Sequence, residues 1–158
     1  MTDATVLVEK FWKALNADRT VMLCAEGVAP RPMTALREDG QGPIWFFTAI
    51  DTEMGRATEG GEPLGAVLML TSKGHDLFAS ATGQLEQHND REVIDRLWNP
   101  FIAAWYTGKD DPKLRLMRFQ PHQAEVWENG NSLLAGIKML IGIDPKRDFK
   151  DQAKQVKL

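Results

Sequence analysis

The chain has 158 residues, a formal net charge of −3 and 43% hydrophobic residues, as expected for an ordinary globular protein. This length predicts one domain over residues 1–158, and the slightly acidic charge argues against non-specific nucleic-acid binding. No run approaches the ~18 apolar residues of a membrane span, no signal-peptide pattern opens the chain, and the single cysteine, Cys24, excludes an intrachain disulfide. We therefore expect a cytoplasmic protein without nucleic-acid or membrane partners.

The N-terminal region predicts a helix followed by a buried strand. Apolar residues recur at helical spacing between Thr5 and Asn16. The run Thr20–Ala25 is short and apolar, and Gly27 ends it, so we expect a strand there.

The next stretch combines two strand-like runs with a turn. Arg31–Arg37 and Pro43–Ile50 flank a segment rich in Gly, Pro and Asp, which predicts a β-hairpin with a longer loop. Pro32 places the start of the first strand at an edge or a bulge, because proline cannot donate to a ladder. Such a hairpin would hold a cation, aromatic faces and hydroxyls close together. That mixture suits a flat, charged ligand better than a plain core.

A second hairpin is predicted in the middle of the chain. Residues 52–61 are polar and contain three glycines, so we expect a short helix or turn and then a loop. Leu64–Ser72 and Leu77–Gln87 predict two paired strands. Gly83 within the second indicates a bulge or a close approach of another backbone.

Helices and further strands follow. Asp90 is expected to cap a helix, and a second short helix is predicted over Phe101–Tyr106. Leu114–Gln120 and Gln123–Trp127 predict two strands separated by a turn at Pro121.

The C-terminal region predicts a helix over 132–141 and then a charged tail or a short edge strand. The complete pattern is about seven short strands and three to four helices. We expect a mainly β (α+β) fold, in which an antiparallel barrel carries helices over its openings.

Five short motifs occur in a fixed order: Arg31-Pro32-Met33, Trp45-Phe46-Phe47-Thr48, Leu97-Trp98-Asn99-Pro100, the segment 105–112, and Ala124-Glu125-Val126-Trp127. Each motif alone is weakly specific, but their order and spacing together are more specific. With these motifs the chain resembles the general stress protein branch of the pyridoxamine 5′-phosphate oxidase-like, FMN-binding split barrels. The resemblance extends over most of the chain, up to Gly142.

The resemblance implies an antiparallel split β-barrel with flanking helices, which binds FMN at the interface of a homodimer. It implies eight cofactor-binding residues: Arg31, Met33, Thr34, Phe47, Thr48, Thr52, Trp105 and Trp127. Arg31 would face the phosphate or the ribityl chain, and Thr52 stands where the family has a phosphate-binding serine or threonine. The backbone at residues 33–34 would contact the flavin, and Phe47 with Thr48 would lie beneath the ring. The two tryptophans are candidates for an aromatic side chain that closes the partner's pocket.

The chain departs from the family pattern beside the phosphate position. The family has a lysine two residues after the Ser/Thr, whereas this chain has Met54, preceded by Glu53. A phosphate would lose one cation, so we expect weaker FMN binding, and we expect a lysine at position 54 to restore it. Arg56 could replace the cation only if the loop turned inward.

Plainer interpretations stay open for the same residues. Arg31 is also explained as a surface arginine at a strand start, and Trp98, Trp105 and Trp127 as side chains that seal helices to the barrel or to a second subunit.

No metal site or catalytic residue is predicted. His75, His88 and His122 lack partners at the spacing of a zinc site, which favours surface histidines. The sequence has neither a nucleophile elbow nor a P-loop.

Two functions fit this pattern. The first is a flavin-dependent oxidoreductase of the general stress type, whose chemistry would belong to the flavin. The alternative is a non-catalytic flavin-binding module, or a dimer with weak or lost cofactor binding. A split barrel that uses deazaflavin or haem is a third possibility. Whether the protein is an enzyme, its substrate or electron donor and its physiological role stay open.

Overall fold

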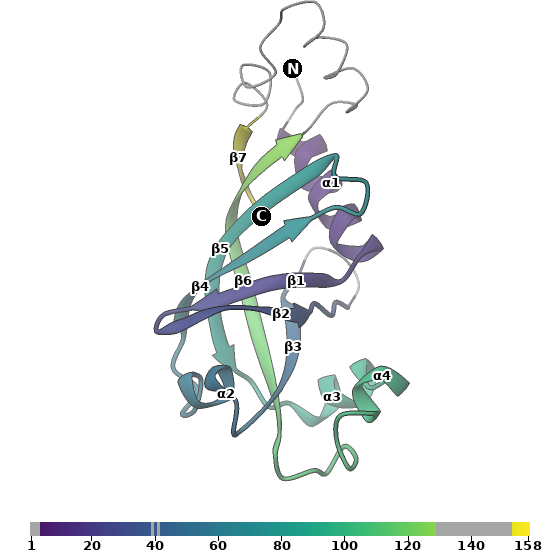
Figure 1. Cartoon of the computed structure of the whole chain (residues 1–158), viewed down its shortest axis with the longest axis vertical. Coiled ribbons are helices and arrows are strands. Elements are labelled where there is room, and N and C mark those ends of the chain that lie inside the picture. Colours follow the sequence, from purple (N-terminus) through teal and green to yellow (C-terminus); the bar gives the residue numbers. More distant parts are fainter. Residues whose placement is uncertain (1–3, 39, 41, 129–152) are drawn as a thin grey trace, which may run out of the picture.

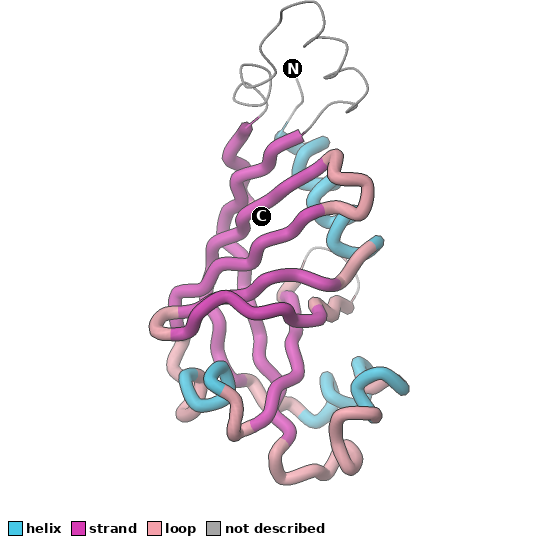
Figure 2. Tube along the Cα trace, in the orientation of Figure 1, coloured by secondary structure: helices cyan, strands magenta, loops and turns pink. Residues whose placement is uncertain are grey.

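The computed structural model describes residues 4–38, 40, 42–128 and 153–158. In chain order these residues form α1 (Ala4–Ala17), β1 (Thr20–Ala25), β2 (Val28–Thr34), β3 (Ile44–Ala49), α2 (Glu53–Ala57), β4 (Leu64–Thr71), β5 (Leu77–Gln87), α3 (Arg91–Leu97), α4 (Pro100–Ala103), β6 (Leu114–Glu128) and β7 (Ala153–Lys157). The strands make one antiparallel sheet in the order β2-β1-β4-β5-β6-β3, with β7 also paired to β6 (Figures 1 and 2). The expected split barrel with flanking helices is confirmed.

The predicted hairpin over residues 31–50 is wrong. Because these two strands do not pair along their length, the barrel stays open between them. The strand β2 pairs with β1 across a tight turn at Gly27, whose φ of 75° lies in the left-handed region that favours glycine. The following strand β3 pairs with β6 instead. A single bridge, Leu36 to Trp45, joins the β2 side to β3. Figure 1 shows the reason: β1 and β2 run across the molecule, whereas β3 runs along its length, so the two strands diverge.

The predicted turn at Pro121 is also wrong, because β6 is one continuous strand of 15 residues. Pro121 is tolerated at a β-bulge, where the register with β5 shifts beside Gly83. A Cβ atom on Gly83 would lie 2.1 Å from the carbonyl oxygen of Gln120. The expectation that this glycine marks a bulge or a close approach is therefore confirmed.

The helices agree with most of the local signals. Asp90 caps α3, since its carboxylate accepts from the backbone N–H of Glu92. Asn99 caps α4 in the same way, but α4 ends at Ala103, earlier than predicted. The predicted helix over 132–141 lies outside the described residues, and the strand β7 agrees with the expected edge strand. No helix in the described part of the chain is long and apolar enough to cross a membrane.

Two apolar clusters stabilise the fold. The larger one joins α1, through Phe11 and Leu15, to the sheet. The smaller one lies beneath α3 and α4 and contains Trp45, Ile94 and Leu116. This second cluster anchors the two helices at the end of the barrel where β2 and β3 separate.

The short helix α2 packs closely against the end of β3. Its cap is Thr52, whose hydroxyl oxygen accepts from the backbone N–H of Gly55 at 2.9 Å. A Cβ atom on Gly55 would lie only 2.0 Å from the carbonyl oxygen of Ala49, so a glycine is needed for this approach. Met54 is 0% exposed and belongs to the larger core cluster. The expectation that a lysine at position 54 would hold a phosphate is therefore wrong, because this side chain points into the core.

We predict that Met54→Lys destabilises the protein. The free energy of unfolding should fall by about 3 kcal/mol or more, since a cation would replace a fully buried thioether. The volume-conserving variant Met54→Leu should cost less than about 1.5 kcal/mol. Urea unfolding of the three proteins measures this difference, and a Lys variant as stable as the parent would show that the side chain escapes the core.

Candidate functional site

A cavity of about 720 Å³ lies where β2 and β3 separate. We call it the seam cavity. Its walls come from β2, the end of β3, Thr52 before α2, and the segment 99–106 that contains α4. The structure brings seven of the eight expected cofactor-binding residues around it: Arg31, Met33, Thr34, Phe47, Thr48, Thr52 and Trp105.

Trp127 does not line the seam cavity. It is half-buried near the far end of β6, where it pairs with Phe78 of β5. Leu116, beside Phe47, is 11 residues earlier on the same strand. Because a strand advances about 3.3 Å per residue, roughly 36 Å of strand separates the two positions. Trp127 could reach a cavity of this kind only in another subunit.

Two strand edges face each other across the seam cavity. Leu36 and Trp45 exchange both backbone hydrogen bonds, and the Ala35 N–H donates to the carbonyl of Arg19. Since pairing alternates along antiparallel strands, the backbone groups of Thr34 and Phe47 point away from β1 and β6 and into the seam. The same alternation directs the backbone of Met33 toward β1. Of the two backbone contacts expected at 33–34, only that of Thr34 is available.

Arg31 places a guanidinium at the cavity wall, but an acidic partner is already present. Its Nη2 lies 3.1 Å from Oε2 of Glu53, the first residue of α2. The side chain of Arg31 is 30% exposed. Its Nε is buried and has no hydrogen-bond partner in the part of the chain that the structure describes. Arg31 therefore lines the cavity as a cation that is already paired with a carboxylate.

The two threonine hydroxyls next to α2 form a short chain of hydrogen bonds. Thr52 Oγ1 donates to the carbonyl of Ala49 at 2.9 Å and accepts from the N–H of Gly55. Thr48 Oγ1 lies 2.7 Å from Thr52 Oγ1. Either hydroxyl can be the donor of this last bond, because a hydroxyl proton rotates to suit its partners. Both hydroxyls are thus hydrogen-bonded within the chain.

Aromatic side chains form the wall opposite β2. The ring of Phe47 meets Trp98 edge-on, with centroids 6.1 Å apart, and Trp98 contacts Tyr106. Burial, together with the charges of Asp111 and Asp51, raises the pKa of Tyr106 to about 12. The phenol therefore stays protonated over the physiological range and can donate a hydrogen bond.

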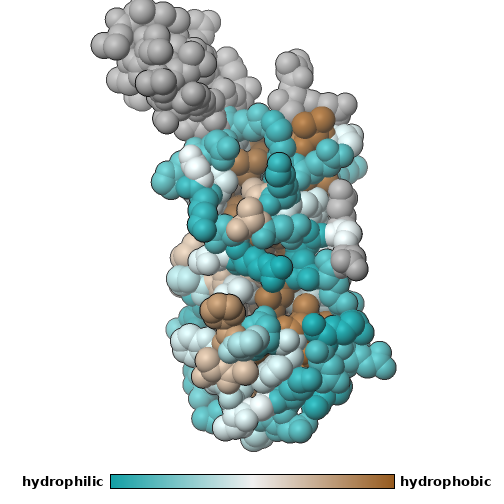
Figure 3. Space-filling view, turned by 90° about the vertical axis from the view of Figure 1, so that its right-hand side faces the viewer, coloured by the Kyte–Doolittle hydropathy of each residue, from teal (hydrophilic) through white to brown (hydrophobic). Residues whose placement is uncertain are grey.

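Two large apolar side chains lie exposed at the rim. Phe101 is 85% exposed and Trp105 is 83% exposed, although both line the cavity. The face seen in Figure 3 is largely polar, and apolar residues interrupt it near its upper end and again in the lower half, where Figure 1 places α3 and α4. Exposed aromatic residues of this size often mark a contact with a ligand or another chain.

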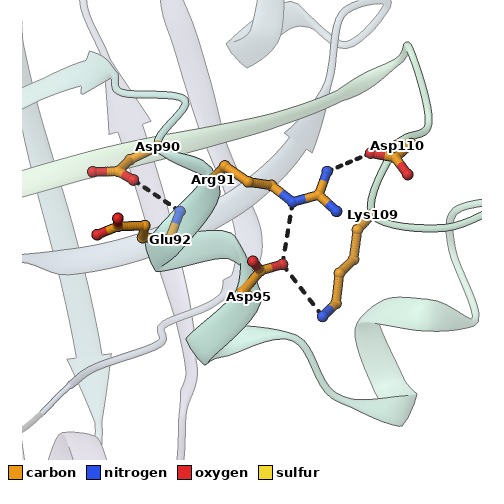
Figure 4. A network of polar contacts seen from close by, with 6 residues as sticks. All are labelled: Asp90, Arg91, Glu92, Asp95, Lys109 and Asp110. Atoms are coloured by element: carbon orange, nitrogen blue, oxygen red, sulfur yellow. Dashed lines mark hydrogen bonds and ion pairs between the residues drawn. The ribbon is translucent and has the colours of Figure 1, made fainter.

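A polar network holds this rim in place (Figure 4). Arg91 of α3 forms ion pairs with Asp95 and with Asp110, and Lys109 reaches Asp95 at 3.3 Å. All of these pairs are at the surface, where solvent screening leaves an ion pair little effect on stability. The network therefore orients the loop after Tyr106 more than it stabilises the fold.

The loop itself is organised by Asp111. Its carboxylate accepts from the backbone N–H groups of Thr107 and Lys113, and these two bonds lower the pKa of Asp111. The turn keeps Tyr106 against the second core cluster.

The sequence analysis missed several lining residues, among them Arg19, Asn99 and Phe101. Arg19 is exposed, and no carboxylate among the described residues pairs with it. It reaches the cavity only because the segment before β1 pairs with the chain after β2. The pKa of Arg37 is lowered, first by the burial of Arg37 itself and second by the positive charge of Arg19. Arg56, the other suggested cation, is exposed and does not line the cavity.

The sequence of the chain matches the profile of the family described as pyridoxamine 5′-phosphate oxidase like over residues 7–147. General stress protein 26 of Bacillus subtilis is 23% identical over 64 residues, which is 40% of this chain and 46% of that protein. The match thus spans about half the length of this relative.

Two crystal structures are more similar. A general stress family protein from Xanthomonas campestris pv. campestris is 51% identical, with a TM-score of 0.76 and coverage of 87% of this chain and 97% of the other. A protein from Xanthomonas citri, described as a general stress FMN/FAD-binding protein, is 50% identical, with a TM-score of 0.71 and coverage of 82% and 94%. The profile match, these identities and the open barrel agree, and the chain therefore belongs to the pyridoxamine 5′-phosphate oxidase like family, among its general stress proteins.

Proposed function

We propose that the protein binds a flavin, FMN, in the seam cavity and has flavin-dependent oxidoreductase capacity. The observation that carries this proposal is the cavity itself. It places two unpaired strand edges and aromatic walls around one space, with a guanidinium at its wall. A flat ring with a polar rim and an anionic tail fits this combination. The Xanthomonas citri relative, described as FMN/FAD binding, supports the same ligand.

Each wall would have its own role. The backbone groups of Thr34 and Phe47 would bond the polar rim of the ring, and the residues of the 99–106 segment would exclude water. Arg31 would hold the phosphate. The bound flavin would supply hydride or electron transfer, so this chain would contribute orientation and shielding.

We further propose a cytoplasmic homodimer. Phe101 and Trp105 leave apolar surface exposed at the mouth of the cavity, and a second copy would cover it. Trp127, which is far from the cavity of its own subunit, would then be available to the partner's cavity.

A non-catalytic flavin-binding module, or a dimer with weak cofactor binding, is the second candidate. The pairing of Arg31 with Glu53 favours it, because the cation of the site already has an anion. The burial of Met54 adds to this, since that position offers no further charge.

Reconstitution tests the proposed function. The purified protein should bind FMN in titration calorimetry, show the flavin absorbance bands and oxidise a nicotinamide donor. A coloured protein without turnover would favour the non-catalytic module. If neither FMN nor riboflavin binds, the flavin proposal is wrong.

Arg31→Ala should weaken FMN binding about tenfold without unfolding the chain, because one charge-assisted contact to phosphate is lost. Riboflavin, which has no phosphate, should bind the variant and the parent alike. Arg56→Ala is the matched control, since it removes an exposed cation that does not line the cavity. Equal FMN affinities for Arg31→Ala and the parent would identify Arg31 as a plain surface charge.

Light scattering should give the mass of a dimer at micromolar concentration. Replacing Phe101 and Trp105 by serine should shift the protein toward the monomer, because the double variant removes the exposed apolar rim. A monomeric mass for the parent at every concentration would contradict the proposed dimer.

A further inference from the structure

A carboxylate already pairs with the cation at the cavity wall. Glu53 does not line the seam cavity itself, but it contacts Arg31, which does, at 3.1 Å, and it is 62% exposed and in reach of solvent. Glu53 directly follows Thr52 in the chain. A phosphate bound by Arg31 would therefore also lie close to the Glu53 carboxylate. A carboxylate and a phosphate would compete for the same guanidinium.

The neighbouring hydroxyls are satisfied as well. Thr52 Oγ1 donates to the carbonyl of Ala49, and Thr48 and Thr52 are joined by a hydrogen bond. The polar groups at this end of the cavity are therefore bonded to one another. An entering phosphate shares the Arg31 guanidinium with Glu53, and it meets the repulsion of a like charge at short range.

This competition costs the phosphate affinity. An exposed ion pair contributes little to stability, so Glu53 can swing into solvent while the fold stays intact. Its negative charge nevertheless stays on the first residue of α2, next to the phosphate position. A ligand without a phosphate would meet neither obstacle.

Resting on the proposed flavin binding, we propose that Glu53 is a specificity-determining residue of the seam cavity. It neutralises Arg31 and so lowers the affinity for phosphorylated ligands, which narrows the preference for FMN over riboflavin. The same carboxylate also suits the N-terminus of α2, but that structural role would affect both ligands alike.

The test compares FMN and riboflavin by titration calorimetry on the full chain. Glu53→Gln should raise the affinity for FMN about tenfold, because one competing charge is removed, and it should leave riboflavin binding unchanged. The gain should shrink as salt is added. Glu59→Gln is the matched control, since Glu59 is exposed, has the same charge and is not the carboxylate that pairs with Arg31.

A double-mutant cycle decides whether Glu53 acts through Arg31. In an Arg31→Gln background, Glu53→Gln should lose most of its effect on FMN. Glu53→Ala provides a second variant in case the Gln variant folds poorly, and thermal unfolding checks both.

The outcomes separate the two proposals. An equal gain for riboflavin and FMN, or no gain for FMN, overturns the role of Glu53 while the flavin proposal stands. The role is equally overturned if Glu59→Gln reproduces the gain, because a general change in net charge would then be responsible. If no variant binds either flavin, the proposed function fails, and the role of Glu53 fails with it.

Discussion

The architecture depends on the absence of a hydrogen-bonded ladder between β2 and β3. Beyond the bridge between Leu36 and Trp45, β2 and β3 do not pair, although they follow each other in the chain. Each strand is paired on its other side, β2 with β1 and β3 with β6, so each keeps one free edge. Unpaired edges are normally a hazard for aggregation, and proteins cover them. Here α2 and the segment around α4 cover the opening from two sides, and what they enclose is the seam cavity.

The polar end of that cavity shows how close packing and ligand binding compete. Gly55 lets α2 approach the end of β3, and this approach sends Met54 into the core and leaves Glu53 beside Arg31. One glycine thus decides which of two neighbouring side chains enters the core and which one meets Arg31. Stability favours the buried thioether, while the exposed acid costs the fold little and sets the charge that a ligand meets. Thr52 takes part in both, since its hydroxyl caps the helix and lines the cavity.

The opposite wall is ordered by a different balance of forces. The surface ion pairs between α3 and the loop after Tyr106 are individually weak, so they only orient this loop. The stability of the 99–106 segment comes from its packing on the second core cluster. Trp98 and Tyr106 are held against that cluster, whereas Phe101 and Trp105 remain outside it. A wall that is anchored at its base and apolar at its rim is well suited to meet a ligand or a second subunit. This is why the proposed dimer and the proposed flavin site depend on the same segment.

The sequence by itself determined the features that arise from local chemistry. Helical periodicity predicted α1, the cap at Asp90 predicted α3, and the run Thr20–Ala25 was a strand with the expected bounds. The motifs predicted the family, and seven of the eight residues proposed from it meet at one cavity. Tertiary structure alone decided which strands pair, because β3 pairs with β6, whose paired residues lie about 65 to 75 positions further along the chain. It also decided that β6 continues through Pro121, since the bulge there needs Gly83 of another strand. The side on which Met54 lies depends on how α2 docks, and that contact is absent from any local pattern.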